Sequence, residues 1–142
     1  MTLDTRAAAA PPSGRTPQAF IEAFLRAFEN LDMAAFAACF AEDATVFFPA
    51  PEPPLRAHGR AEIRRRFENV FAAIRAGAPG GPPYHRLEPD TLLVQPLGED
   101  AAVVTLHLRN AERTARRSFV LQRRAGAWSI VHLHASNGPP VN

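Results

Sequence analysis

The sequence predicts an α+β domain in which three N-terminal helices pack on one face of a curved antiparallel sheet. Two observations support this fold class. Apolar residues recur at helical spacing in three segments before residue 77, and from residue 84 onward no helical period survives. The second half instead contains strand-like segments separated by the turns LGED, NAER and RAGA, each short enough to join antiparallel neighbours.

Length and composition indicate a single domain. The 142 residues, 46% of them hydrophobic, are enough for one core and too few for two ordinary domains. Residues 1–15 mix alanine, proline, glycine and charge without periodicity, so we expect a flexible arm there. The domain is expected to span residues 16–137, with a short tail at 138–142.

Each predicted helix has a recognisable start or face. Thr16 and Pro17 combine an N-cap hydroxyl with a proline in the first turn, and phenylalanines then recur every four residues. Asp32 can cap a second, shorter helix that reaches Phe40. A proline-rich loop at 50–58 leads into a third helix over 59–77, whose RRR run is expected to be a solvated face rather than a phosphate site.

The strands follow from alternation and from the residues that stop them. DATVFFP, at 43–49, turns β-like after the second helix and ends at prolines. Further strands are expected at about 84–96, 101–110, 113–124 and 127–136. Because their turns are short, these four strands should form a meander that the helices cover on one face.

Composition also argues against several classes of function. Sixteen arginines, with no lysine, face 14 acidic residues, and the net charge of +2 gives little support to nucleic-acid binding. No window approaches the roughly 20 apolar residues of a membrane span, so we expect a soluble, cytoplasmic protein with no membrane partner. The single Cys39 lies in an apolar helical segment and is expected to be a buried structural thiol.

Three sequence motifs resemble a known superfamily. They are FEN at 67–69, GEDAA at 98–102 and RRAGAWSIVHLHAS at 123–136, the last with a basic pair, a glycine, a tryptophan and His-x-His-x-Ser. Together with the order of elements, they resemble the nuclear transport factor 2-like superfamily, which includes SnoaL-like polyketide cyclases and ketosteroid isomerase. Within this superfamily, the motifs are similar to those of the association (hub) domain of calcium/calmodulin-dependent protein kinase II. The resemblance implies a cone-shaped fold with a cavity between helices and sheet.

The resemblance does not carry the catalytic residues of the isomerase to this chain. The positions that match its tyrosine, its base and its second acid hold Phe24, Phe48 and, approximately, Phe119. A benzyl group can neither accept a proton nor donate a hydrogen bond to an enolate, so this chemistry is not expected. A carboxylate pocket like that of the association domains is not expected either, because three of their arginine positions hold His107, Phe119 and Ala135 here.

The expected cavity is therefore largely apolar. Its lining is predicted to consist of Phe24, Phe48, Phe67, Tyr84, Thr105, His107, Arg109 and Phe119. His107 is singled out because it interrupts the apolar strand AAVVTLHLR on the face that carries Thr105. Three roles remain open for it: a core histidine bonded to Thr105 or to backbone, an anchor for a ligand, or a weakly supported catalytic base.

The strand WSIVHLHAS predicts an interface between subunits. On a regular strand, one face holds Trp128, Ile130, His132 and His134. If that face is the outer one, it exposes large apolar groups, which usually mark a contact surface, so we expect a homodimer or larger assembly. We expect no metal at the two histidines, because no third ligand has suitable spacing.

The leading functional hypothesis is a homo-oligomeric domain that binds a small hydrophobic molecule, without assigned catalysis and without a cofactor. An isomerase, dehydratase or polyketide-cyclase type of enzyme acting in the same cavity is one alternative. A pure oligomerisation module, with the cavity filled by phenylalanines, is the other.

Overall fold

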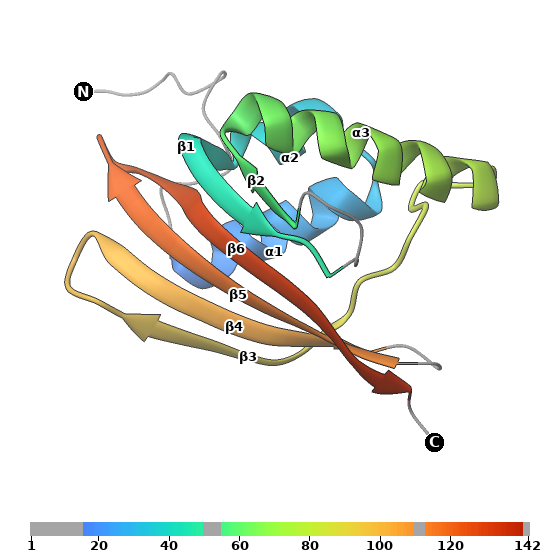
Figure 1. Cartoon of the computed structure of the whole chain (residues 1–142). Helices are drawn as coiled ribbons and strands as arrows, with labels where there is room; N and C mark the ends of the chain where they lie inside the picture. Colours follow the sequence, from blue (N-terminus) through green and yellow to red (C-terminus); the bar gives the residue numbers. More distant parts are fainter. Residues whose placement is uncertain (1–15, 50–54, 110–112, 141–142) are drawn as a thin grey trace.

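The computed structural model describes residues 16–49, 55–109 and 113–140, and in them three helices cover one face of a six-stranded, curved sheet (Figure 1). The arm expected at 1–15 lies outside these ranges. The elements run in the order α1 (Pro17–Glu29), α2 (Met33–Ala38), β1 (Phe40–Phe47), β2 (Arg56–His58), α3 (Arg60–Gly77), β3 (Pro89–Pro96), β4 (Ala101–Arg109), β5 (Arg113–Arg124) and β6 (Ala127–Pro140). The predicted α+β class is confirmed.

The first two helices begin where their capping residues predict. The Thr16 side chain accepts a hydrogen bond from the amide of Ala19 at 3.1 Å, and Asp32 accepts one from the amide of Ala35 at 3.2 Å. The second helix ends at Ala38 rather than at residue 40, because the chain has by then entered β1.

The sheet has the strand order β2-β1-β6-β5-β4-β3, and all neighbouring pairs are antiparallel except β1 and β6, which are parallel. The expectation of an antiparallel sheet therefore holds for the meander but not for this pair. The expected proline-rich loop contains the short strand β2. The third strand begins at residue 89 instead of 84, and β6 continues to residue 140, beyond the expected end of the domain at 137.

The hairpin between β5 and β6 is the one that the RAGA turn predicts. Ala125 and Gly126 both have positive φ, 52° and 78°. Two consecutive left-handed residues match the twist of the flanking strands in a two-residue hairpin. This turn fixes the pairing of the two longest strands.

A bulge in β6 changes which residues face the helices. Leu121 pairs with Ile130, whereas its neighbour Val120 pairs with His132, so Val131 is an extra residue between them. As a result Trp128 and Ile130 lie in the core, with 4% and 0% exposure. The expectation that they share an outer face with the two histidines is wrong, because the strand is not regular.

The predicted orientation of β4 is also wrong. Val104 and Leu106 are buried under the helices, so Thr105 and His107 point to the opposite face of the sheet. Apolar residues occur on both faces of this strand, with Val103 on the uncovered face and Val104 and Leu106 in the core. His107 therefore does not interrupt the face of β4 that the helices cover.

Phenylalanine rings form the centre of the core between helices and sheet. Phe36 is fully buried, and its ring centroid lies 4.9 Å from that of Phe24, 4.7 Å from that of Phe67 and 5.1 Å from that of Phe71. Contacts of this kind join α1, α2 and α3 into one layer. None of the helices in the described part of the chain is long and apolar enough to cross a membrane.

Candidate functional site

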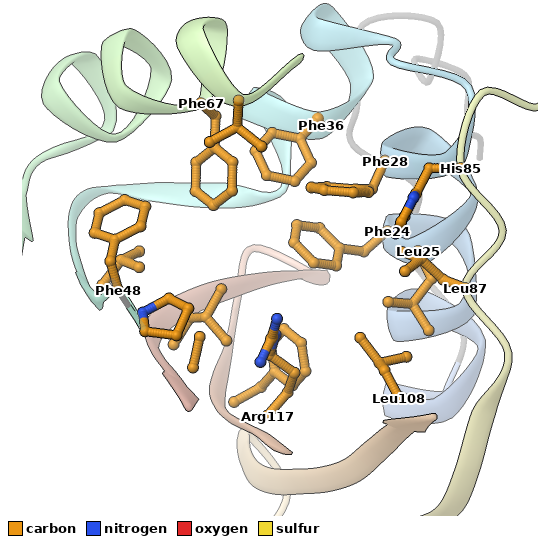
Figure 2. A pocket seen from close by; sticks show the side chains of 16 residues that line it. Phe24, Leu25, Phe28, Phe36, Phe48, Phe67, His85, Leu87, Leu108 and Arg117 are labelled. Carbon is orange, nitrogen blue, oxygen red and sulfur yellow. The ribbon is translucent and has the colours of Figure 1, made fainter. Parts of the chain in front are cut away.

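A cavity of about 200 Å³, partly open to solvent, lies between the helices and the covered face of the sheet (Figure 2). All but two of its sixteen lining residues have apolar side chains. The helices contribute Phe24, Phe28, Phe36 and Phe67. The sheet contributes Leu108, Phe119, Leu133 and Ala135, together with one charged residue, Arg117.

The structure brings together half of the residues predicted to line the cavity. Phe24, Phe48, Phe67 and Phe119 all lie on its wall. Tyr84 does not: its half-buried ring lies below the guanidinium of Arg75, 5.3 Å away.

The other three predicted lining residues, Thr105, His107 and Arg109, lie on the uncovered face of the sheet. His107 Nδ1 is 2.7 Å from the hydroxyl oxygen of Thr91, so its hydrogen-bond partner is neither Thr105 nor a ligand in the cavity. Arg109 forms an exposed ion pair with Asp90 at 3.4 Å. The expectation that these three residues line the cavity is therefore wrong, because on β4 they face away from the helices.

Arg117 is the charged residue of the cavity wall that the sequence did not lead us to expect. It precedes Phe119 by two positions on β5 and therefore faces the helices with it. Its guanidinium rises from the sheet toward the space enclosed by the phenylalanine rings (Figure 2). The spacing of two residues from Phe119 indicates that Arg117 shares its face of the strand. An arginine in the run ARRS, however, resembles a solvated residue.

Two backbone carbonyls hold the Arg117 side chain. Its Nη1 donates to the carbonyl oxygens of Arg116 at 2.9 Å and Ser136 at 3.2 Å. Burial lowers the pKa of Arg117 from its ordinary value, because the apolar wall solvates the cation poorly. No carboxylate in the described part of the chain forms an ion pair with it.

Exposed and half-exposed residues mark the rim of the cavity. His85 is exposed, and its ring lies 6.0 Å from that of Phe28. Phe48 directly follows β1 and lies under the guanidinium of Arg66, which is 4.2 Å from the ring centroid. The chain beyond Pro49, at 50–54, is outside the described residues.

The cavity wall carries few groups for chemistry. His85 and Arg117 supply its only polar side chains among the described residues, and neither Asp nor Glu lines it. General acid–base catalysis of the isomerase type needs a carboxylate or a similar group near the ligand. Elsewhere in the described ranges, no three His, Cys, Asp or Glu side chains gather as a possible metal site.

On the uncovered face of the sheet, the two histidines of β6 lie beside β1. His132 Nδ1 is 2.7 Å from the hydroxyl oxygen of Thr45, and the ring of Phe47 lies 5.4 Å from that of His132 and 5.3 Å from that of His134. The pKa of His132 is lowered, first by burial and then by the nearby His134. A backbone hydrogen bond at Thr45 opposes this shift but does not reverse it. These two histidines therefore lie on the face where an interface was expected, whereas Trp128 and Ile130 do not.

Helices on a curved sheet, with a cavity between the two layers, define the nuclear transport factor 2-like class of folds. The model of the SnoaL-like domain family matches residues 18–142, and the chain belongs to that family. No curated protein matches the sequence.

Solved structures of low sequence identity share the fold. An NTF2-like protein of unknown function from Pseudomonas putida KT2440 is 21% identical, with a TM-score of 0.66 over 82% of this chain and 80% of that one. A candidate calcium/calmodulin-dependent protein kinase type II association domain from Thiobacillus denitrificans ATCC 25259 is 21% identical, with a TM-score of 0.64 over 94% and 98%. A candidate dehydratase of the NTF2-like family from Streptomyces avermitilis is 20% identical, with a TM-score of 0.63 over 86% and 91%.

Proposed function

We propose that the chain binds a small, largely apolar molecule in the cavity between the helices and the sheet. The observation that carries the proposal is a partly open space of about 200 Å³, whose wall, as far as the described residues form it, is apolar except at two residues. Burial of apolar ligand surface against such a wall is favourable, by about 25 cal/mol for each Å² removed from water.

The volume of the cavity limits the size of the ligand. An apolar protein cavity of about 150 Å³ can hold benzene, whereas pockets for drug-sized ligands measure about 300–1,000 Å³. The cavity here lies between these values. We therefore assign it a ligand with one ring, or a short branched chain, rather than a steroid or a polycyclic ketide.

Binding is a better description of this site than acid–base catalysis. The dehydratase name of one structural neighbour suggests an enzyme, but the described lining offers no carboxylate that could act as its base. The three positions matched to isomerase groups carry benzyl side chains, and each of these rings packs against another phenylalanine ring. Phe24, for example, has its ring centroid 5.6 Å from that of Phe119.

Ligand-observed NMR tests the proposal. A panel of single-ring compounds, which includes toluene, p-cresol, indole, benzamide and benzoate, is titrated with the wild type and with Ala135→Leu, whose longer side chain enters the cavity. We expect saturable binding of at least one compound to the wild type and at least tenfold weaker binding to the folded variant. Binding of none, or equal binding to both proteins, would contradict the proposal.

A second proposed function is self-association through the uncovered face of the sheet. No described helix packs on this face, and it carries Phe47, Val103 and Val120 together with Leu93, which is 54% exposed. Exposed apolar groups on one surface are typical of subunit contacts. The association-domain name of one structural neighbour also suggests an assembly.

Analytical ultracentrifugation of the wild type and of Val120→Glu tests self-association. Val120 pairs with Val103 and with His132, so the substitution places a charge in the middle of this face. We expect a dimer or larger assembly for the wild type and a smaller species for the variant. A wild-type monomer of 15.5 kDa would contradict the proposal.

A further inference from the structure

We infer that the ligand carries a carboxylate, bound by the guanidinium of Arg117, with the rest of the molecule among the phenylalanine rings. This inference rests on the proposed binding function and specifies the chemical class of the ligand. Arg117 lies at none of the three positions where the resemblance to association domains places an arginine. The argument depends on the surroundings of this one side chain.

The hydrogen bonds of Arg117 leave one edge of its guanidinium available. Nη1 carries two hydrogens and donates to two carbonyl oxygens, those of Arg116 and Ser136. A guanidinium has five N–H donors, so Nε and Nη2 keep three that no described residue accepts. The parallel N–H groups of Nε and Nη2 match the two oxygens of one carboxylate.

Charge balance also favours an anionic ligand. The partners of Arg117 are neutral carbonyls, and the residues around the guanidinium, such as Ala135, Leu133 and Phe119, are apolar. A cation in such surroundings loses hydration that neutral acceptors only partly replace. A carboxylate in the cavity would supply the missing counter-charge where the low dielectric strengthens the attraction.

The number of cationic side chains in the cavity favours a ligand with a carboxylate over one with a phosphate ester. Among the described residues, Arg117 is the single cationic side chain inside the cavity, since His85 lies exposed at the rim. The paired N–H donors of one guanidinium satisfy a monoanion with two oxygens. A phosphate dianion would instead leave charge and acceptors buried without partners. The expected ligands are single-ring aromatic acids or short branched-chain acids.

Isothermal titration calorimetry with benzoate and with benzamide, which has almost the same shape but no charge, tests the inference. The proteins are the wild type, Arg117→Met and Arg116→Met. Arg116 is the matched control, because it is exposed and points to the opposite face of the same strand. We expect the wild type and Arg116→Met to bind benzoate at least about tenfold more tightly than benzamide, and Arg117→Met to lose this preference.

The outcomes separate the inference from the proposed function. If benzamide and other neutral rings bind the wild type as tightly as benzoate, the carboxylate inference fails and the binding function stands. If no compound of the panel binds, both fail. Tighter binding of phenyl phosphate than of benzoate would also overturn the inference.

A second measurement on the wild type covers the case in which Arg117→Met does not fold. The Nε–H resonance of Arg117 is followed by ¹H–¹⁵N NMR during titration with benzoate and with benzamide. We expect a downfield shift with benzoate only. Binding of benzoate without a change at this resonance would overturn the inference.

Discussion

Arg117 and Ala135 lie opposite each other across the antiparallel pair of β5 and β6, on the face of the sheet that the helices cover. The methyl group of Ala135 leaves room beside the guanidinium, and both residues line the cavity. The pairing of the long side chain of Arg117 with the short one of Ala135 thus helps to keep this space open. The first prediction follows from this pair.

Filling the space beside Arg117 should not weaken the fold. In Ala135→Leu the new side chain enters the cavity, so we expect a free energy of unfolding within about 1 kcal/mol of the wild-type value. Ala102 is the matched control, because it is buried on the same face of the sheet without lining the cavity. Ala102→Leu should cost about 1–3 kcal/mol by overpacking. Urea denaturation measures both, and equal losses would contradict an open cavity.

The phenylalanines should differ in their contribution to stability according to their depth. Phe36 is fully buried among five other phenylalanine rings, and Phe36→Ala should cost about 3–5 kcal/mol. Phe48 lies half-exposed at the rim, so Phe48→Ala should cost markedly less. Chemical denaturation of both variants decides this. A loss for Phe48→Ala as large as that for Phe36→Ala would show that the rim is packed like the core.

Cys39 should be inert in the folded protein. It is fully buried, and burial raises the pKa of its thiol to about 12, so little thiolate exists at neutral pH. Its Sγ donates to the carbonyl oxygen of Ala35 at 3.4 Å. We expect no reaction with an aromatic disulfide reagent at pH 8 within minutes, and stoichiometric reaction in denaturant. Rapid reaction of the folded chain would contradict this burial.

His132 should titrate below its ordinary range. Burial and then His134 lower its pKa, so the folded state favours the neutral ring. Its contribution to stability is therefore complete above about pH 6.5 and is lost as the pH falls through the folded pKa. NMR titration should give a midpoint below about 6.5 that rises in His134→Gln.

The stability of the two proteins should differ in the same pH range. Between pH 7.5 and 5, the wild type should lose more free energy of unfolding than His132→Gln, in which position 132 no longer titrates. Denaturation at several pH values measures this difference. An identical decline in both proteins would show that His132 does not contribute.

Local signals predicted the elements that depend on local chemistry. Thr16 and Asp32 cap helices as expected, and the RAGA segment forms the expected hairpin. The superfamily resemblance implied that Phe24, Phe48 and Phe119 line the cavity, and the structure has all three on its wall. These features depend on capping, turns and apolar spacing, which can be read within a few residues of the chain.

Orientation within the sheet could not be predicted in the same way. The extra residue Val131 reverses the faces of β6, and nothing in WSIVHLHAS marks it, since apolar residues stand on both sides of the bulge. In β4, adjacent Val103 and Val104 make either face plausible, so His107 was placed inward. Arg117 was missed because the run ARRS resembles a solvated segment, although the spacing of two residues from Phe119 places it on the covered face.

The measurement that tests the central claim most directly is a crystal structure of the protein with 4-bromobenzoate, located by the anomalous scattering of bromine. We predict that the bromine peak lies among the rings of Phe24, Phe36 and Phe67, and that the carboxylate lies within hydrogen-bonding distance of Arg117 Nε and Nη2. A bromine peak outside the cavity, or a cavity closed by the phenylalanine side chains at saturating ligand, would contradict the claim.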